Sequence, residues 1–99
     1  MEVMVVMTVP ADTAKFEAFM AANGERLNEI SVTARAAGSS GHRFAVGDGQ
    51  IVVVDYWDSA EHFQSFISVP EVQATMGEMG AQGEPTVTIA RAKGYPSEY

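Results

Sequence analysis

The sequence predicts an α+β domain with the element order β-α-β-β-α-β, the ferredoxin-like arrangement, in which an antiparallel sheet carries both helices on one face. Short apolar runs rich in β-branched residues alternate with segments whose apolar residues recur at helical spacing, and an Asp-Gly turn joins the two middle runs. At 99 residues the chain has the length of one small domain. We expect a single domain over residues 1–99, with its core over 2–92 and a tail over 93–99.

The first strand and the first helical segment are predicted from an apolar run and a helical stripe. Residues 2–9 are apolar on both sides of a strand, so both of its faces should be covered. A helical stripe of apolar residues follows, with Asp12 or Thr13 as its cap. Asn23-Gly24 interrupts this stripe, so we expect either one kinked helix or two abutting helices that end at Gly38.

A β-hairpin is the clearest local signal in the chain. Two runs typical of strands, over residues 42–46 and 51–57, flank the segment 47–50. Asp48-Gly49 suits a two-residue type I′ turn, which needs a positive φ at both of its central residues. We expect residues 39–41, Ser-Ser-Gly, to form a loop ahead of the hairpin.

Two short helices and a last strand complete the pattern. Asp58 and Glu61 have the spacing of a capping box, and Ser68–Glu71 repeats it, so a helix should begin at each place. Gly80 is suited to the position just after the second of these helices. Residues 86–92 alternate between polar and apolar types, which predicts the final strand.

The predicted sheet has large aliphatic side chains on both faces. Since the helices cover one face, the other must expose either the set with Val3 and Val5 or the set with Met4 and Val6. A large contiguous apolar patch on a single chain marks an interaction site. We therefore expect two copies to pack sheet against sheet in a homodimer with two-fold symmetry.

Composition and charge exclude several classes of protein. The chain has 13 acidic and 6 basic residues, a net charge of −7, so we expect no nucleic-acid partner, because phosphate binding relies on Lys and Arg. It has no cysteine, which excludes disulfides, thiolate catalysis and Cys-based zinc sites. No apolar run is long enough for a membrane span and no signal peptide is evident, so we expect a cytoplasmic protein. The histidines and acids lack metal-ligand spacing, so no metal site is expected.

The junction between the second hairpin strand and the helix after it resembles that of a known family. Residues 51–57 run into Trp57-Asp58-Ser59-Ala60-Glu61-His62-Phe63, which is similar to the strand-Trp-x-Ser/Asp-x-Glu-x-Phe junction of the antibiotic biosynthesis monooxygenases. The resemblance covers residues 2–92. It implies a dimeric α+β barrel, a ligand between the sheet and the helices of each subunit, and no cofactor. The superfamily also includes haem-degrading enzymes, isomerases and members without known activity, so fold alone does not determine function.

Two branches of that superfamily can be compared with this chain. The haem-degrading branch uses a helical Trp, a His further along the same helix and an Asn on the first strand. These positions correspond here to Phe66 and Met76, and residues 2–9 contain no Asn, so haem degradation by that mechanism is not expected. The quinone-oxidising branch resembles this chain at Trp57. In it the substrate's own enolate or phenolate reduces dioxygen, and the protein supplies an apolar cavity with a few polar groups.

His42 and Asp55 are the candidate catalytic residues. His42 lies in a predicted strand, and histidine can move protons near neutral pH, although a structural role is the alternative. Asp55 falls within an apolar row of its strand, where a carboxylate needs a partner. We expect either a structural ion pair with Arg43 or Arg91 or exposure of Asp55 at the end of the strand, and the alternative is that Asp55 acts as a general base.

Four further residues are candidates for substrate binding. Trp57, the only tryptophan, is either a core residue or a pocket wall that stacks on a planar ligand, and Phe66 would form a second wall. Asn23 lies on the apolar stripe of the first helical segment, where it either caps the kink or donates a hydrogen bond to the ligand. His62 lies at the edge of a helical stripe and is either structural or part of the site.

Together these residues suggest three functions. The leading hypothesis is a cofactor-independent monooxygenase that acts on a small aromatic or quinone-like molecule. A non-catalytic homodimer of the same fold, either structural or binding a small molecule, is the second. An isomerase or cyclase that uses His42 or Asp55 is the third.

Overall fold

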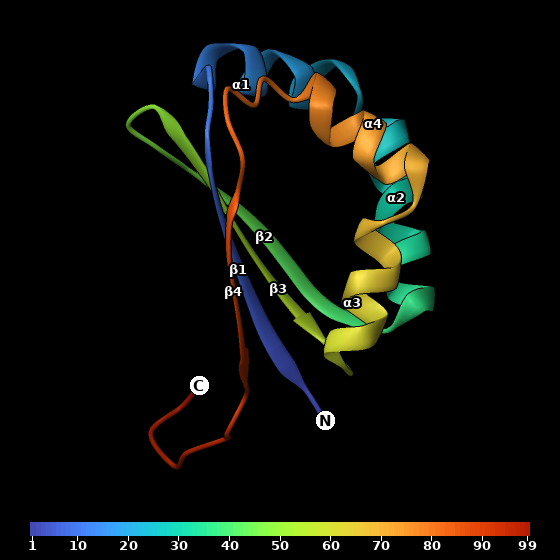
Figure 1. The fold of residues 1–99 in the computed structure, drawn as a ribbon, viewed down its shortest axis with the longest axis vertical. Coiled ribbons are helices and arrows are strands. Elements are labelled where there is room, and N and C mark those ends of the chain that lie inside the picture. The colour runs from blue at the N-terminus through green and yellow to red at the C-terminus, as the bar shows by residue number, and fades with distance from the viewer.

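A computed structural model describes all 99 residues as a four-stranded antiparallel sheet with helices on one of its sides (Figure 1). The strands are β1 (Val3–Pro10), β2 (Ser39–Gly47), β3 (Gln50–Trp57) and β4 (Thr86–Arg91), and their order in the sheet is β2-β3-β1-β4. The helices are α1 (Thr13–Ala22), α2 (Gly24–Ala37), α3 (Ala60–Ile67) and α4 (Pro70–Glu78). The predicted β-α-β-β-α-β order is confirmed, with a pair of helices at each helical position. None of the helices is long and apolar enough to cross a membrane.

Alternation along the two central strands divides the sheet into a helix-facing side and an open face. On β1 and β3, buried residues alternate with half-buried or exposed ones. The buried set belongs to a core cluster of Val3, Val5, Met7, Ala11, Phe16, Ile51, Val53, Trp57 and Phe63. The open face carries Met4, Val6, Val52 and Val54, and no helix lies on that side (Figure 1). Only 14 of the 99 residues are buried, so the core is thin.

The hairpin between β2 and β3 is confirmed, but its turn is not of the predicted type. Gly47 pairs with Gln50, which leaves Asp48 and Gly49 as the two turn residues. Gly49 has a φ of 67°, whereas no residue other than glycine has a positive φ. A type I′ turn needs two such residues, so Asp48 avoids the left-handed conformation that glycine adopts without steric cost.

The predicted loop at Ser39–Gly41 is instead the first part of β2. Ser39 pairs with Trp57 and Gly41 with Tyr56, and the register shifts between the two pairs. The Ser39 hydroxyl donates to the carbonyl oxygens of Tyr56 and Gly41 over 3.2 and 3.3 Å. Pairing with β3 therefore outweighs the turn-forming tendency of this Ser-Ser-Gly segment.

The helix boundaries correct two predicted caps. The capping box predicted over Ser68–Glu71 does not form: Val69 precedes α4 without a side-chain cap, and the Ser68 hydroxyl donates to the carbonyl oxygen of Gln64 over 2.7 Å. Asp12 caps α1, and its carboxylate accepts a hydrogen bond from the backbone N–H of Lys15 over 3.0 Å. The cap of α3 is Ser59, not Asp58: the Ser59 hydroxyl accepts from the backbone N–H of His62 over 3.1 Å. The Asp58 carboxylate binds the His62 ring instead, at 2.7 Å. Asp58 and Ser59 are neighbours, and both residue types can cap a helix. The Asp58 carboxylate is bound to the His62 ring, and the Ser59 hydroxyl forms the cap.

Candidate functional site

A cavity of about 710 Å³ lies between the sheet and the helices. Small-molecule sites commonly have volumes of roughly 300–1,000 Å³, so this space suits such a ligand. Most of the wall is apolar and comes from both layers, with side chains that include Met7, Phe16, Ile30, Ile51, Val53, Trp57, Phe66, Ile67, Val72, Met76 and Met79. An apolar wall excludes water and strengthens the few polar contacts made inside it.

A histidine–aspartate pair forms part of this wall. His42 on β2 stands directly opposite Asp55 on β3, so their side chains lie on the same side of the sheet. The His42 Nδ1 atom is hydrogen bonded to Oδ1 of Asp55. The indole Nε1 of Trp57 donates to the other oxygen of the same carboxylate, Oδ2, over 3.4 Å. Asp55 is only 7% exposed, and these two donors satisfy the buried charge.

The predicted partners of Asp55, Arg43 and Arg91, are therefore wrong. Arg43 is the neighbour of His42 in β2 and opposes Val54, so it lies on the open face. Arg91 on β4 pairs with Val3 of β1, and β1 separates β4 from Asp55. Because side chains alternate along β2, the residue beside Asp55 on the helix-facing side of the sheet is His42 and not Arg43.

The geometry of the pair leaves one nitrogen of His42 available for chemistry. A carboxylate only accepts hydrogen bonds, so Nδ1 carries the hydrogen in the bond to Asp55. In the neutral ring Nε2 is then a proton acceptor, and no protein group bonds to it. The ring packs edge-on against Phe44, with 4.6 Å between centroids, and its side chain is 43% exposed. Asp55 and Phe44 thus orient a reachable base at the cavity wall.

Two of the predicted binding residues form an aromatic wall beside this pair. Trp57 and Phe66 both line the cavity, and their ring centroids are 5.2 Å apart. Phe63 supports the indole from another side, at 5.9 Å. Trp57 is only 1% exposed, so it is a core residue and a lining residue at once. The structure thus brings His42, Asp55, Trp57 and Phe66 to one cavity.

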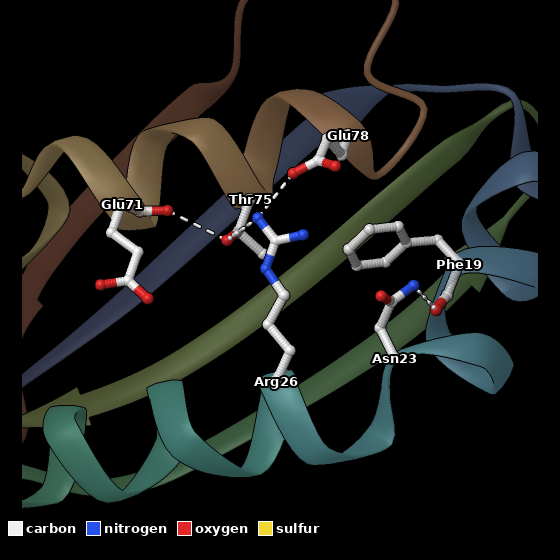
Figure 2. Close-up of polar contacts among 6 residues, drawn as sticks. All are labelled: Phe19, Asn23, Arg26, Glu71, Thr75 and Glu78. Atoms are coloured by element: carbon white, nitrogen blue, oxygen red, sulfur yellow. Dashed lines mark hydrogen bonds and ion pairs between the residues drawn. The ribbon is translucent and has the colours of Figure 1, made fainter.

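The other two predicted binding residues, Asn23 and His62, lie outside the cavity wall. Asn23 stands between α1 and α2, and its side-chain amide donates to the carbonyl oxygen of Phe19 over 2.8 Å (Figure 2). His62 is held by Asp58 on the exposed side of α3. Neither residue lines the cavity, and each side chain is hydrogen bonded to a residue four positions earlier.

A polar cross-link between α2 and α4 is a feature that no sequence spacing predicts. Arg26 Nη2 donates to the Thr75 hydroxyl over 2.8 Å and to Glu78 Oε2 over 2.6 Å (Figure 2). The Thr75 hydroxyl in turn donates to the carbonyl oxygen of Glu71 over 3.0 Å. Thr75 is 1% exposed and lines the cavity, so the cross-link forms part of the helical wall.

The charges of this cross-link stabilise each other. The hydrogen bond from Arg26 lowers the pKa of the Glu78 carboxyl from its ordinary value. The same hydrogen bond raises the pKa of Arg26. The guanidinium also lies 5.9 Å from the centre of the Phe19 ring, which adds a cation–π contact with α1.

A second polar stretch of the wall comes from α2. Asn28, Ser31 and Arg35 recur at helical spacing and all line the cavity. The side-chain hydrogen bonds of α2 belong to Arg26 and Thr33, so these three side chains make none. In the whole chain, no three His, Asp or Glu side chains are grouped so that they could hold a metal ion.

Comparison with known proteins places this fold. No family sequence model and no curated protein sequence matches the chain. Among solved structures, SnoaB, a cofactor-independent oxygenase from Streptomyces nogalater, is similar with a TM-score of 0.67 and 16% identity over 98% of each chain. A monooxygenase from Streptomyces coelicolor, ActVA-Orf6, in complex with the ligand nanaomycin D, has a TM-score of 0.69 and 15% identity, covering 98% of this chain and 92% of its own. An antibiotic biosynthesis monooxygenase has a TM-score of 0.67 and 10% identity, covering 92% and 98%. At these identities the likeness is one of fold, and the chain has the α+β fold of the antibiotic biosynthesis monooxygenases, as its strand–helix junction predicts.

Proposed function

We propose that the protein is a cofactor-independent monooxygenase that oxidises a small hydroxylated aromatic or quinone-like molecule. The observation that carries this proposal is the pair His42–Asp55 at the wall of an apolar cavity. A buried carboxylate that fixes a histidine is the arrangement of an oriented general base. Two proteins of the same fold support the choice of reaction, one described as a cofactor-independent oxygenase and the other as a monooxygenase in complex with a small ligand.

The reaction needs only a base, dioxygen and an electron-rich substrate. His42 Nε2 takes the acidic proton of a ring CH₂ or phenol group, and the resulting anion transfers one electron to dioxygen. The two radicals combine into a C–O bond, and His42 returns its proton to the peroxide. Cleavage of the O–O bond then releases water and leaves a carbonyl, so that R₂CH₂ and O₂ give R₂C=O and H₂O. The substrate supplies all the electrons, and the apolar wall keeps bulk water from protonating the anion.

Oxygen consumption tests this proposal. We expect uptake with a panel of anthrones and dihydroxynaphthalenes in chelator-treated buffer, with the ketone or quinone product identified by mass spectrometry. His42→Gln should lower the rate by about 10²–10⁴-fold, since it removes the base, and Asp55→Asn should lower it by a smaller factor. His62→Gln is the matched control, because His62 lies outside the cavity. A wild-type protein without uptake on the panel, or a His42→Gln variant with full activity, contradicts the proposal.

The same assay separates the other two functions. Conversion of a substrate without consumption of oxygen would identify an isomerase or cyclase that uses the same base. Tight binding of aromatic molecules without any conversion would identify a binding protein. These outcomes differ in oxygen balance and in product, so one set of incubations distinguishes them.

We further infer that two copies associate through the open face. Met4, Val6, Val52 and Val54 lie on it without helical cover, and Tyr56 beside them is 39% exposed. A sheet face of this kind is commonly covered by a second sheet. Light scattering at micromolar concentration should give twice the chain mass of 10.6 kDa, and Val54→Glu should halve it. A wild-type mass of a single chain contradicts this inference.

A further inference from the structure

We infer that the ligand of this cavity is an anion, an aromatic molecule with a carboxylate or a similarly acidic group, and that Arg35 on α2 selects it. The inference deepens the proposed function, since it names the substrate class of the same cavity. It concerns binding and not oxidation, so it can be tested without turnover.

The cavity wall contains few charged side chains. Apart from the histidine, the ionisable side chains of the wall are Asp55 and Arg35. The Asp55 carboxylate is hydrogen bonded to His42 and Trp57 through its two oxygens, so it is already engaged within the protein. Arg35 takes part in none of the ion pairs of the chain, which join Arg26 to Glu78 and the two histidines to aspartates. Arg35 is therefore the one charged side chain of the wall that has no partner within the protein, in a chain whose net charge is −7.

Two polar side chains of α2 lie near Arg35 in the cavity wall. Asn28 and Ser31 lie on the same stretch of α2, line the same cavity and make no hydrogen bonds with the protein. The guanidinium offers only donors, in a planar fork that matches a carboxylate, and an amide and a hydroxyl can donate beside it. Arg35 itself is exposed, so it lies where the cavity meets solvent. This stretch of wall is suited to acceptor oxygens at the cavity rim.

The rest of the cavity wall is mainly apolar and aromatic, which indicates the other part of the ligand. Trp57 and Phe66 present aromatic rings 5.2 Å apart, which suit the apolar body of a planar ligand. A molecule that satisfies both walls has fused or substituted aromatic rings and one acidic group. Because the protein as a whole is acidic, a ligand anion is repelled overall, and the local contact with Arg35 must overcome that repulsion.

Two probes of the same shape test the role of Arg35. Anthraquinone-2-carboxylate and its uncharged carboxamide differ in charge, and binding of each is followed by calorimetry and by quenching of the single tryptophan, Trp57. The wild-type protein should bind the carboxylate about tenfold more tightly than the carboxamide. Arg35→Gln should remove this preference by weakening the carboxylate alone, and Arg35→Lys should restore part of it.

The control is a matched loss of charge outside the cavity. Arg91→Gln removes an exposed guanidinium from β4 that does not line the cavity, so it should keep the tenfold preference. Equal affinity of the wild-type protein for the two probes, failure to bind either, or equal effects of Arg35→Gln and Arg91→Gln would overturn the inference. Selective binding of the carboxylate together with absence of oxygen uptake would leave the inference standing and contradict only the proposed oxygenase activity.

Discussion

Replacement of Thr75 by valine removes one oxygen atom from the helical wall of the cavity and should destabilise the protein. The Thr75 hydroxyl accepts from Arg26 and donates to the Glu71 carbonyl, and the residue is 1% exposed. A buried hydrogen bond to a charged group contributes about 1.5–3 kcal/mol and a neutral one about 0.5–1.5 kcal/mol. The added methyl group returns about 1 kcal/mol of apolar burial. We therefore expect a loss of about 1–3.5 kcal/mol, and each kcal/mol lowers the Tm of a domain of this length by roughly 4–8 °C.

Urea unfolding, followed by Trp57 fluorescence and circular dichroism, measures this loss. Thr75→Ser is the matched control, because it keeps the hydroxyl and removes only the methyl group. A double-mutant cycle with Arg26→Gln should show coupling between the two positions, since they share a hydrogen bond of 2.8 Å. A Thr75→Val variant as stable as the wild type, with no coupling to Arg26, would refute the reasoning.

Three further predictions concern other parts of the molecule. Glu78→Gln should lower Tm at neutral pH. Because Arg26 lowers the folded-state pKa of Glu78, the stabilisation is complete above the unfolded-state pKa and is lost as the pH falls through the folded-state value, so melting curves of the two proteins should converge in acid. Gly38→Ala should cost about 1–3 kcal/mol in urea unfolding, because φ is 124° and a new Cβ would meet the Asp58 carboxylate; an unchanged midpoint would contradict this. Trp57→Phe should weaken calorimetric binding of anthraquinone-2-carboxylate and also lower stability, because the indole is buried and donates to a carboxylate; unchanged affinity would remove it from the ligand-binding wall.

The order of strands and helices was predictable because it depends on local patterns. The apolar runs of β1 and β3 and the helical stripes are properties of neighbouring residues. The failures lie where two local signals compete. Ser39–Gly41 has the composition of a loop, yet pairing with Trp57 and Tyr56 makes it a strand. Asp58 and Ser59 can both cap α3, and the contact of Asp58 with His62 decides between them.

Within the site, the pairing of His42 with Asp55 could be predicted from the register of the β2–β3 hairpin, whereas contacts between helices could not. From the turn pair Gly47–Gln50, five steps along each strand lead to His42 and Asp55, so the hairpin itself indicates their contact. That count would have identified the partner of Asp55. The cross-link of Arg26 with Thr75 and Glu78 joins residues about fifty positions apart and depends on how α2 packs beside α4. No spacing within the chain can show such a contact.

The thin core has a consequence for how long the protein persists in a cell. With 14 of 99 residues buried and a cavity of about 710 Å³ beside them, the ligand that we propose would fill space that the protein's own side chains leave open. A ligand that binds the folded state alone, at about 100 times its Kd, adds about 2.7 kcal/mol to the free energy of unfolding. Such a gain suppresses the unfolded population that proteases degrade. The supply of ligand should thus regulate the abundance of the protein, in addition to occupying its site.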